Sequence, residues 1–429
     1  MQASAVIGPP LAATDLRGLG RLRECQDCGL FQRLPPLPRG SVARCPRCSA
    51  VLRRRRTDPV GRALALALTG LLLFGLAMTL PFIDVDVGGK IRATTLLTGP
   101  TELEQQGVWE LGLVVLATTV AAPVGRLLAL TYVLLGLSLP RPPRHLYMVF
   151  RWVEWLSRWS MVEVFLLGVF VAYTRLTAIA HVDVGGAVLA LGALMLVTAA
   201  ADSSLDHEAV WEGMERHGAV AGHAAAEKRP GVAPGRRYGC DSCGLVSHAT
   251  VVCPRCGAAV RPRKRDSLNR TWALLAAAAI LYIPANMLPV LTLIRFGRGD
   301  PSTILGGVQE LAAANMWPLA ALVFFASITV PLIKLVGLTL LLVSTHRRAR
   351  GRLRERTLLY RFVDSVGRWS MIDVFMISIL TALVRMGAIA SVMPGPGAVS
   401  FCAVVILTML AALSFDPRLM WDAAGRAGT

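Results

Sequence analysis

The chain has 429 residues, of which 54% are hydrophobic and 17% charged, and its formal net charge is +18. A soluble globular protein of this length carries charge on nearer a quarter of its residues, so the composition disfavours a soluble enzyme and favours a membrane protein. The basic residues stand in short blocks beside apolar runs, which is the pattern of cytoplasmic loops between membrane spans. We therefore expect a membrane partner and no nucleic acid partner.

Eight of the nine cysteines form four CxxC pairs, arranged as two modules. The two sets of four are Cys25, Cys28, Cys45 and Cys48, with 16 residues between the pairs, and Cys240, Cys243, Cys253 and Cys256, with nine. This spacing is typical of four-thiolate zinc sites, which close a tetrahedron and leave no position for substrate. It predicts two structural zinc ribbons in a reducing, cytoplasmic compartment. The alternatives are redox-active dithiols and zinc-dependent regulation.

Eight apolar segments are long enough to span a bilayer, four after each cysteine module. The expected fold class is a mostly α membrane protein made of two parallel repeats, each a zinc ribbon followed by four transmembrane helices. Polar segments near residues 84–107 and 295–307 lack a basic excess, so we expect them to be loops outside the cytoplasm. The expected divisions are a flexible leader 1–24, ribbon 25–56, membrane domain 60–201, linker 202–238, ribbon 239–265, membrane domain 268–415 and cytoplasmic tail 416–429.

A duplicated motif supports the two repeats. RWVEWLSRWSM begins at Arg151 and RFVDSVGRWSM begins 210 residues later, at Arg361. Because four spans are an even number, both copies enter the membrane in the same direction, and we expect parallel repeats related by an axis along the membrane normal. Both termini and both ribbons then lie in the cytoplasm.

The C-terminal copy carries ionisable residues inside its spans. Lys334 and Asp373 both lie about 15–18 Å from the cytoplasmic ends of their helices, so we expect them side by side. Ser370 shares a helix face with Asp373, and Asp364 is placed to pair with Arg368. Three interpretations stay open: a structural pair that locks two helices, a proton-coupled switch or polar substrate gate, and charges that snorkel to the interface.

The N-terminal copy has a weaker counterpart of this polar cluster. The matching residues are Arg126, Glu154, Arg158, Ser160 and Glu163. Arginine stays charged at any accessible pH, whereas a buried lysine can titrate. If one half acts as a switch, we expect it to be the C-terminal half, with Arg126 and Glu163 as a static pair.

These features together resemble the paraquat-inducible protein A family. The resemblance is carried by the CxxCGL knuckles, the Pro-x-x-Lys segment of the sixth span and RWSM-[VI]-[ED]-VF in both halves, and it extends from about residue 23 to 422. It implies a multi-pass inner-membrane protein of the Gram-negative envelope that moves phospholipid between membranes. It also implies a periplasmic MCE-domain (mammalian cell entry) partner, whose tunnel this chain would load or unload, with energy drawn from the proton gradient.

Two other functions compete with lipid transport. One is a zinc-ribbon membrane scaffold or assembly factor that transports nothing, and the other is a membrane oxidoreductase that uses its CxxC pairs. The chain contains no GxxxxGK[ST] motif, so we do not expect ATP hydrolysis. No nucleophile–base arrangement stands out, and we expect no enzymatic activity.

Overall fold

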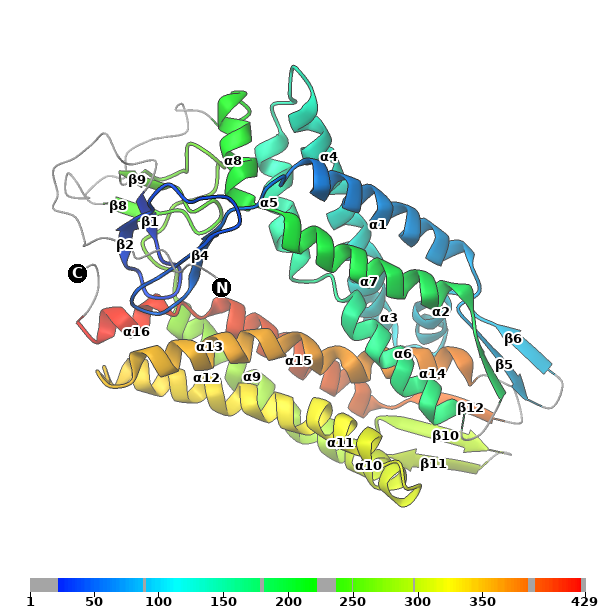
Figure 1. The fold of residues 1–429 in the computed structure, drawn as a ribbon. Coiled ribbons are helices and arrows are strands. Elements are labelled where there is room, and N and C mark those ends of the chain that lie inside the picture. Colours follow the sequence, from blue (N-terminus) through cyan, green and yellow to red (C-terminus); the bar gives the residue numbers. More distant parts are fainter. Residues whose placement is uncertain are drawn as a thin grey trace.

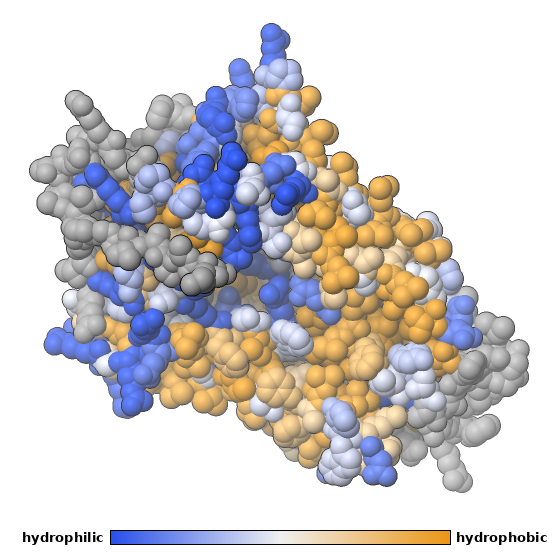
Figure 2. Space-filling view, in the orientation of Figure 1, coloured by the Kyte–Doolittle hydropathy of each residue, from blue (hydrophilic) through white to orange (hydrophobic). Residues whose placement is uncertain are grey.

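The computed structural model describes residues 22–87, 90–177, 181–221, 237–248, 250–295, 298–384 and 390–425. Two helical repeats lie side by side, with both cysteine modules at one end and small β sheets at the other (Figure 1). We call these the ribbon end and the sheet end. Apolar side chains cover the helices between the two ends, and hydrophilic side chains gather at the ribbon end (Figure 2).

Each repeat contains the same series of helices. The first has α1 (Gly61–Thr79), α2 (Thr98–Gln105), α3 (Trp109–Leu116), α4 (Ala122–Ser138), α5 (Leu146–Ser157), α6 (Val162–Leu176), α7 (Gly186–Ser204) and α8 (His207–Arg216). The second has α9 (Ser267–Met287), α10 (Ile304–Ala313), α11 (Trp317–Phe324), α12 (Val330–His346), α13 (Leu353–Val366), α14 (Ile372–Leu383), α15 (Pro396–Ser414) and α16 (Arg418–Ala423).

The eight predicted spans are confirmed as apolar helices of 19 to 31 residues, counted over the described residues. At about 1.5 Å per residue, each is long enough to cross a hydrocarbon layer of about 30 Å. The four longest are composite: α3 continues into α4, α5 into α6, α11 into α12 and α13 into α14. The mostly helical, two-repeat fold class is therefore confirmed.

The second span of each repeat contains a π-helical turn directly before its proline. Residues Ala117–Ala121 form this turn ahead of Pro123, and Phe325–Thr329 form it ahead of Pro331. Proline has no N–H to donate and its ring crowds the preceding turn, so the helix widens locally where the regular bond is lost. The same irregular turn is thus present in both repeats.

Both polar segments that were expected to be loops contain β strands. Strand β5 (Ile83–Val87) pairs with β6 (Lys90–Ala93) and β7 (His181–Val184), all antiparallel. In the second repeat β10 (Leu291–Arg295) pairs in the same way with β11 (Arg298–Ser302) and β12 (Ala390–Pro394). The sequence IDVDV alternates apolar and polar residues with period two, which is the signal that was missed.

The two repeats meet mainly through α14. It packs against α6 and α2 of the first repeat, and the rings of Phe165 and Phe375 make an edge contact with centroids 5.6 Å apart. Gly168 permits this close approach, because a Cβ there would lie 3.1 Å from the Cβ of Phe375. Toward the ribbon end the helices of the two repeats diverge (Figure 1), and a hollow that we call the wedge lies between the two halves (Figure 2).

Each cysteine module is built from short strands joined by cysteine-bearing turns. The strands are β1 (Leu22–Glu24), β2 (Phe31–Arg33), β3 (Val42–Arg44), β4 (Val51–Arg54), β8 (Arg237–Gly239) and β9 (Val246–His248). We call residues 22–54 ribbon 1 and residues 237–260 ribbon 2.

Three expected boundaries need correction. The end of the expected leader, residues 22–24, is strand β1, while residues 1–21 lie outside the described part. The expected linker contains the end of α7 and all of α8, and its residues 222–236 also lie outside. The expected tail includes α16, whose Trp421 is 3% exposed. In each case a short segment packs on a ribbon or on a helix end. Its polar composition is typical of a loop, so this packing was not predicted.

Candidate functional site

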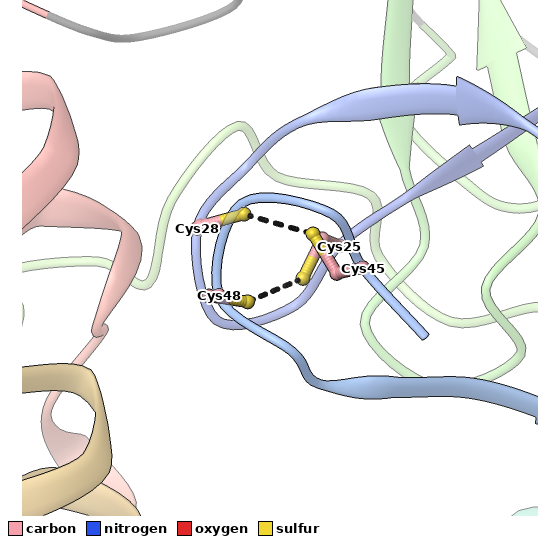
Figure 3. Close-up of side chains that lie close together, drawn as sticks. All are labelled: Cys25, Cys28, Cys45 and Cys48. Carbon is pink, nitrogen blue, oxygen red and sulfur yellow. Dashed lines mark hydrogen bonds between the residues drawn. The ribbon is translucent and has the colours of Figure 1, made fainter. Parts of the chain in front are cut away.

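The four cysteines of each ribbon converge on one point. In ribbon 1 the Sγ atoms of Cys25 and Cys48 lie 3.5 Å apart and those of Cys28 and Cys45 lie 3.6 Å apart (Figure 3). These separations are too long for a disulfide bond of about 2.05 Å. They approach the edge of roughly 3.8 Å that four sulfurs take around zinc at about 2.3 Å. The geometry therefore suits a four-coordinate metal ion.

Ribbon 2 repeats this arrangement. Its Sγ atoms pair as Cys240 with Cys256 and Cys243 with Cys253, both at 3.5 Å. Within each ribbon, the four ligand atoms all lie within 4.8 Å of one another. The cysteines are 0–5% exposed, so both sites are closed to substrate. Each set could hold a metal ion, as the spacing predicted.

A sharp turn follows the second cysteine of each knuckle. Gly29 takes φ +69° there and donates its N–H to the carbonyl of Cys25 at 2.8 Å. A residue with a side chain is disfavoured in this left-handed conformation, which accounts for glycine after Cys28. Ser49 accepts the same conformation, at φ +60°, after Cys48.

The ribbons are exchanged between the repeats. Ribbon 1 shares a hydrophobic cluster with helices of the second repeat, whereas the cysteines of ribbon 2 belong to a cluster that includes α5 and α8 of the first. Arg47 of ribbon 1 lies over the ring of Trp421, 5.2 Å from its centroid. The equivalent Arg255 of ribbon 2 instead donates to Glu215, at 2.6 and 2.9 Å, and to Glu208 at 3.0 Å. Each ribbon therefore ties its own repeat to the other.

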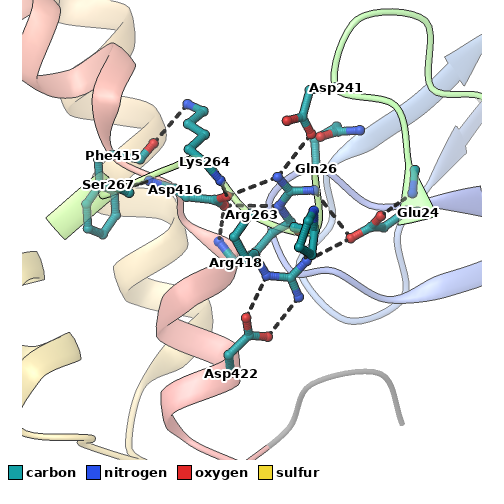
Figure 4. Close-up of polar contacts among 12 residues, drawn as sticks. Glu24, Gln26, Asp241, Arg263, Lys264, Ser267, Phe415, Asp416, Arg418 and Asp422 are labelled. Atoms are coloured by element: carbon teal, nitrogen blue, oxygen red, sulfur yellow. Dashed lines mark hydrogen bonds and ion pairs between the residues drawn. The ribbon is translucent and has the colours of Figure 1, made fainter. Parts of the chain in front are cut away.

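A buried carboxylate joins both ribbons to the C-terminal helix (Figure 4). Glu24 of β1, with its side chain 2% exposed, accepts the N–H of Gly239 at 2.7 Å. It also accepts from Arg263 at 3.2 Å and from Arg418 at 3.3 Å. Burial raises the pKa of Glu24, while Arg418 opposes the shift. Glu24, Arg263, Arg418, Asp416 and Asp422 form what we call the ribbon clamp.

Within the clamp, Arg418 is the central cation. It donates to both carboxylate oxygens of Asp416 at 3.0 Å and forms an ion pair with Asp241 at 3.0 Å. Burial would raise the pKa of Asp416, but its hydrogen bonds to Arg418 hold that pKa below its usual range. Arg263 makes two bonds to Asp422, at 2.6 and 2.9 Å. This network was not anticipated from the sequence.

The expected pairing of Lys334 with Asp373 is not formed. Lys334 is 1% exposed, and its Nζ donates to the hydroxyl of Thr408 on α15 at 3.2 Å. Its neighbour on the adjacent span is Gly367, where a Cβ would lie 3.8 Å from Nζ. Both depths were counted from the cytoplasmic ends as if the helices were regular, but a 3₁₀ turn, Gly367–Met371, precedes Asp373 and places it farther along its span.

Asp373 lies nearer the sheet end, in a cavity between the repeats. The cavity, of about 30 Å³, is also lined by Ser327 and by Arg175 of α6. Both carboxylate oxygens of Asp373 are buried and without a hydrogen bond to the described residues. Ser370, one helical turn before Asp373 along the chain, is 1% exposed, and its hydroxyl also lacks such a bond. We call Lys334, Ser370 and Asp373, the buried polar groups of the second repeat, the polar column.

The other expected pair in this cluster is replaced by a contact between repeats. Arg368 lies 3.9 Å from Glu163 of the first repeat, and the structure shows no ion pair between Arg368 and Asp364. A turn of 3₁₀ helix, Gly367–Met371, separates α13 from α14 and redirects Arg368 away from Asp364. The helical i, i+4 rule does not hold through such a turn.

The counterpart in the first repeat also differs from expectation. Arg126, 8% exposed, pairs with Asp202 at the end of α7 and not with Glu163. Glu154 and Arg158 lie together on α5, at the mouth of the wedge, and Ser160 follows in the turn before α6. In the first repeat the buried cation, Arg126, is therefore paired with a partly exposed carboxylate, that of Asp202. A permanently charged, paired arginine is consistent with a static role.

Several of these polar residues were missed, although the repeat offered a signal. Thr408 matches Thr198 at an offset of 210, and Ser327 matches Thr119 at 208. Arg175 matches Arg385, which lies outside the described residues. A duplicated polar residue inside an apolar span is unusual enough to be singled out.

The architecture defines a class: a duplicated, eight-span membrane protein with a tetrathiolate ribbon on each repeat. The sequence profile of the family described as "Paraquat-inducible protein A" matches residues 60–215 and 268–425. The chain is 36% identical over 402 residues to "Intermembrane transport protein PqiA" of Escherichia coli K12, covering 93% of this chain and 95% of that protein.

Two further relatives are similar along nearly their whole length. "Lipophilic envelope-spanning tunnel protein A" of E. coli K12 is 33% identical over 408 residues, which cover 94% of this chain and 92% of the relative. A "Probable intermembrane transport protein" of Haemophilus influenzae is 26% identical over 403 residues, covering 94% and 96%. No solved structure matches the chain with significance. The chain belongs to the paraquat-inducible protein A family.

Proposed function

We propose that this protein is the inner-membrane component of a system that moves phospholipid between the membranes of a bacterial envelope. The observation that carries the proposal is the similarity, over 93% of the chain, to a protein named for intermembrane transport. A second relative, similar over 94% of the chain, is named for a lipophilic envelope-spanning tunnel. The partner that fits these names is a periplasmic MCE-domain protein, whose tunnel this chain loads or unloads.

The ribbon end faces the cytoplasm in this proposal. Basic residues are dense there, as in the Arg347–Arg361 segment, and basic excess marks cytoplasmic loops. Eight reduced cysteines also suit that compartment, and the ions they hold would be zinc in a structural role. The β sheets then face the periplasm, where the partner would dock.

Energy coupling is assigned to the second repeat. Lys334 and Asp373 are both nearly inaccessible to solvent, at 1% and 4% exposed, and neither has an ion-pair partner within 4.0 Å among the described residues. A buried charge without a partner is costly, so such a group changes its protonation state more readily than a paired one. Lys334, Ser370 and Asp373 would pass a proton along the polar column as lipid moves.

A matched pair of substitutions tests this coupling. Lys334→Arg keeps the charge but removes the ability to titrate, and we expect it to abolish lipid transfer, as we also expect of Lys334→Ala and Asp373→Asn. Arg126→Lys, at the equivalent position of the first repeat, keeps the cation that pairs with Asp202 and should leave transfer intact. Equal activity of Lys334→Arg and wild type would refute a titrating role.

A scaffold without transport activity is the second candidate. It is favoured by the ribbon clamp, in which one carboxylate, Glu24, joins the two ribbons and α16. A scaffold would tolerate Lys334→Ala and Asp373→Asn as long as the chain folds and retains its partner. Lipid transfer measured beside partner co-purification therefore separates the two functions.

A further inference from the structure

A second cavity opens at the mouth of the wedge between the repeats. Its volume is about 350 Å³, and it lies between α5 of the first repeat and the first turn of ribbon 2. A volume of this size is within the range of small-molecule sites, roughly 300–1,000 Å³. Figure 2 shows hydrophilic side chains in the hollow between the two halves, beside the apolar surfaces of the helices.

Charged side chains of both signs face this cavity. Arg151 and Glu154 come from successive turns of α5, Arg158 directly follows this helix, and Asp241 comes from ribbon 2. Asp241 is engaged by Arg418 at 3.0 Å. Arg151, Glu154 and Arg158 have no ion pair within 4.0 Å among the described residues. Arg158 acts on Glu154 and on Asp364 of α13 only through longer-range attraction, so the hydrogen-bonding groups of the two cations and the one anion remain available to a ligand.

Two tryptophans complete the cavity. Trp152 and Trp155 are 53% and 50% exposed and make an edge contact with centroids 5.6 Å apart. Tryptophan is enriched where a membrane protein crosses the headgroup layer, and its face attracts ammonium groups. The span that carries them, Leu146–Leu176, has 31 residues and is longer than the hydrocarbon layer requires, so its first turns lie at headgroup level.

We infer that this cavity is a binding site for a zwitterionic phospholipid headgroup of the phosphoethanolamine class, entered from the cytoplasmic leaflet. Arg151 and Arg158 contact the phosphate, Glu154 accepts from the ammonium group, and the acyl chains stay in the lipid beside α5. Arginine suits a phosphate because its planar fork offers two parallel donors. The inference rests on the proposed lipid transport, for which it names the substrate class and the place of entry.

Net charge alone would make the protein prefer anionic lipids to zwitterionic lipids. A chain with a formal charge of +18 attracts anionic lipids such as phosphatidylglycerol without any specific site. An unpaired carboxylate inside the cavity opposes a purely anionic headgroup and favours one that also carries an ammonium group. A preference for phosphatidylethanolamine therefore reports the site and not the overall charge.

The test uses the purified full-length chain and vesicles with equal amounts of dioleoyl-phosphatidylethanolamine and dioleoyl-phosphatidylglycerol. After extraction in mild detergent, native mass spectrometry counts each lipid that stays bound. Wild type should retain the ethanolamine lipid over the glycerol lipid by about fivefold, as one partly buried ion pair would give. Glu154→Gln, of the same shape, should bring that ratio close to one. Arg158→Gln should lower the amount of both lipids.

Matched controls are Glu110→Gln and Arg144→Gln, which change exposed residues away from the cavity and should keep the wild-type ratio. An equal or greater yield of the glycerol lipid in wild type, or an unchanged ratio in Glu154→Gln, would overturn the inference. Lipid binding is measured here without lipid transfer. If wild type keeps the expected ratio of bound lipids but transfers no lipid between membranes, the proposed function is refuted and the binding site is still supported.

Discussion

Arg361 of α13 donates one N–H to the carbonyl of Cys48 at 3.0 Å and lies 3.4 Å from the sulfur of the same cysteine. The arginine belongs to the second repeat and the cysteine to the ribbon of the first. A second bond, to Asp27 at 2.6 Å, fixes the guanidinium against the turn that carries Cys25 and Cys28. The cysteine set of one repeat is therefore held by the membrane helices of the other.

The first prediction concerns metal retention. Replacing Arg361 with Gln removes a cation from beside the Cys48 thiolate, and such outer partners are worth about 10–100-fold in metal affinity. We expect one of two bound zinc ions to exchange with a chelator at least about tenfold faster. If the Arg361→Gln variant releases both ions at the wild-type rate, the contact between Arg361 and Cys48 does not stabilise the bound ion. Arg352→Gln is the control, since that side chain is 82% exposed.

The second prediction concerns the metal itself. Cys28→Ser breaks one tetrathiolate set and leaves the other complete, so zinc measured by elemental analysis should fall from two ions to one per chain. A matched Cys243→Ser variant should do the same. If purified wild type carries no metal and its thiols oxidise reversibly, the ribbons are redox centres and the structural assignment fails.

The third prediction concerns the ribbon clamp. Arg418→Met leaves Glu24 and Asp416 buried beside each other without their shared cation, and breaking a buried ion pair costs about 3–5 kcal/mol. The midpoint of thermal unfolding in detergent should drop clearly. Arg265→Met, at a side chain 73% exposed, should leave the midpoint unchanged. Equal midpoints for the two variants would show that the clamp adds nothing to stability.

The chain pattern predicted the spans and the cysteine sets because both are local signals. An apolar run of about 20 residues and a CxxC spacing each have one dominant structural solution. Contacts between segments far apart in the chain were not predictable in this way. The bond between Glu24 and Gly239 joins residues 215 positions apart, and neither segment contains a sequence pattern that indicates the other as its partner.

The polar cluster shows where depth arguments fail. Lys334 and Asp373 were placed by counting residues from a charged end, which assumes straight, regular helices. The 3₁₀ turn at Gly367–Met371 breaks that assumption for Asp373, because such a turn rises about 2.0 Å per residue in place of about 1.5 Å. Lys334 therefore bonds to Thr408, where a direct ion pair with Asp373 was expected.

The most direct test of the whole account is lipid transfer from labelled vesicles, measured with the partner that co-purifies with the chain. Asp373→Asn and Lys334→Ala should lower the transfer rate by more than about tenfold, as expected when a proton-transferring group is removed. Zinc content and unfolding midpoint should not change, and Val336→Ala, a lipid-facing neighbour 56% exposed, should transfer like wild type. Wild-type transfer by both charge variants, with partner and zinc retained, would contradict the claim that buried charges of the second repeat drive lipid movement.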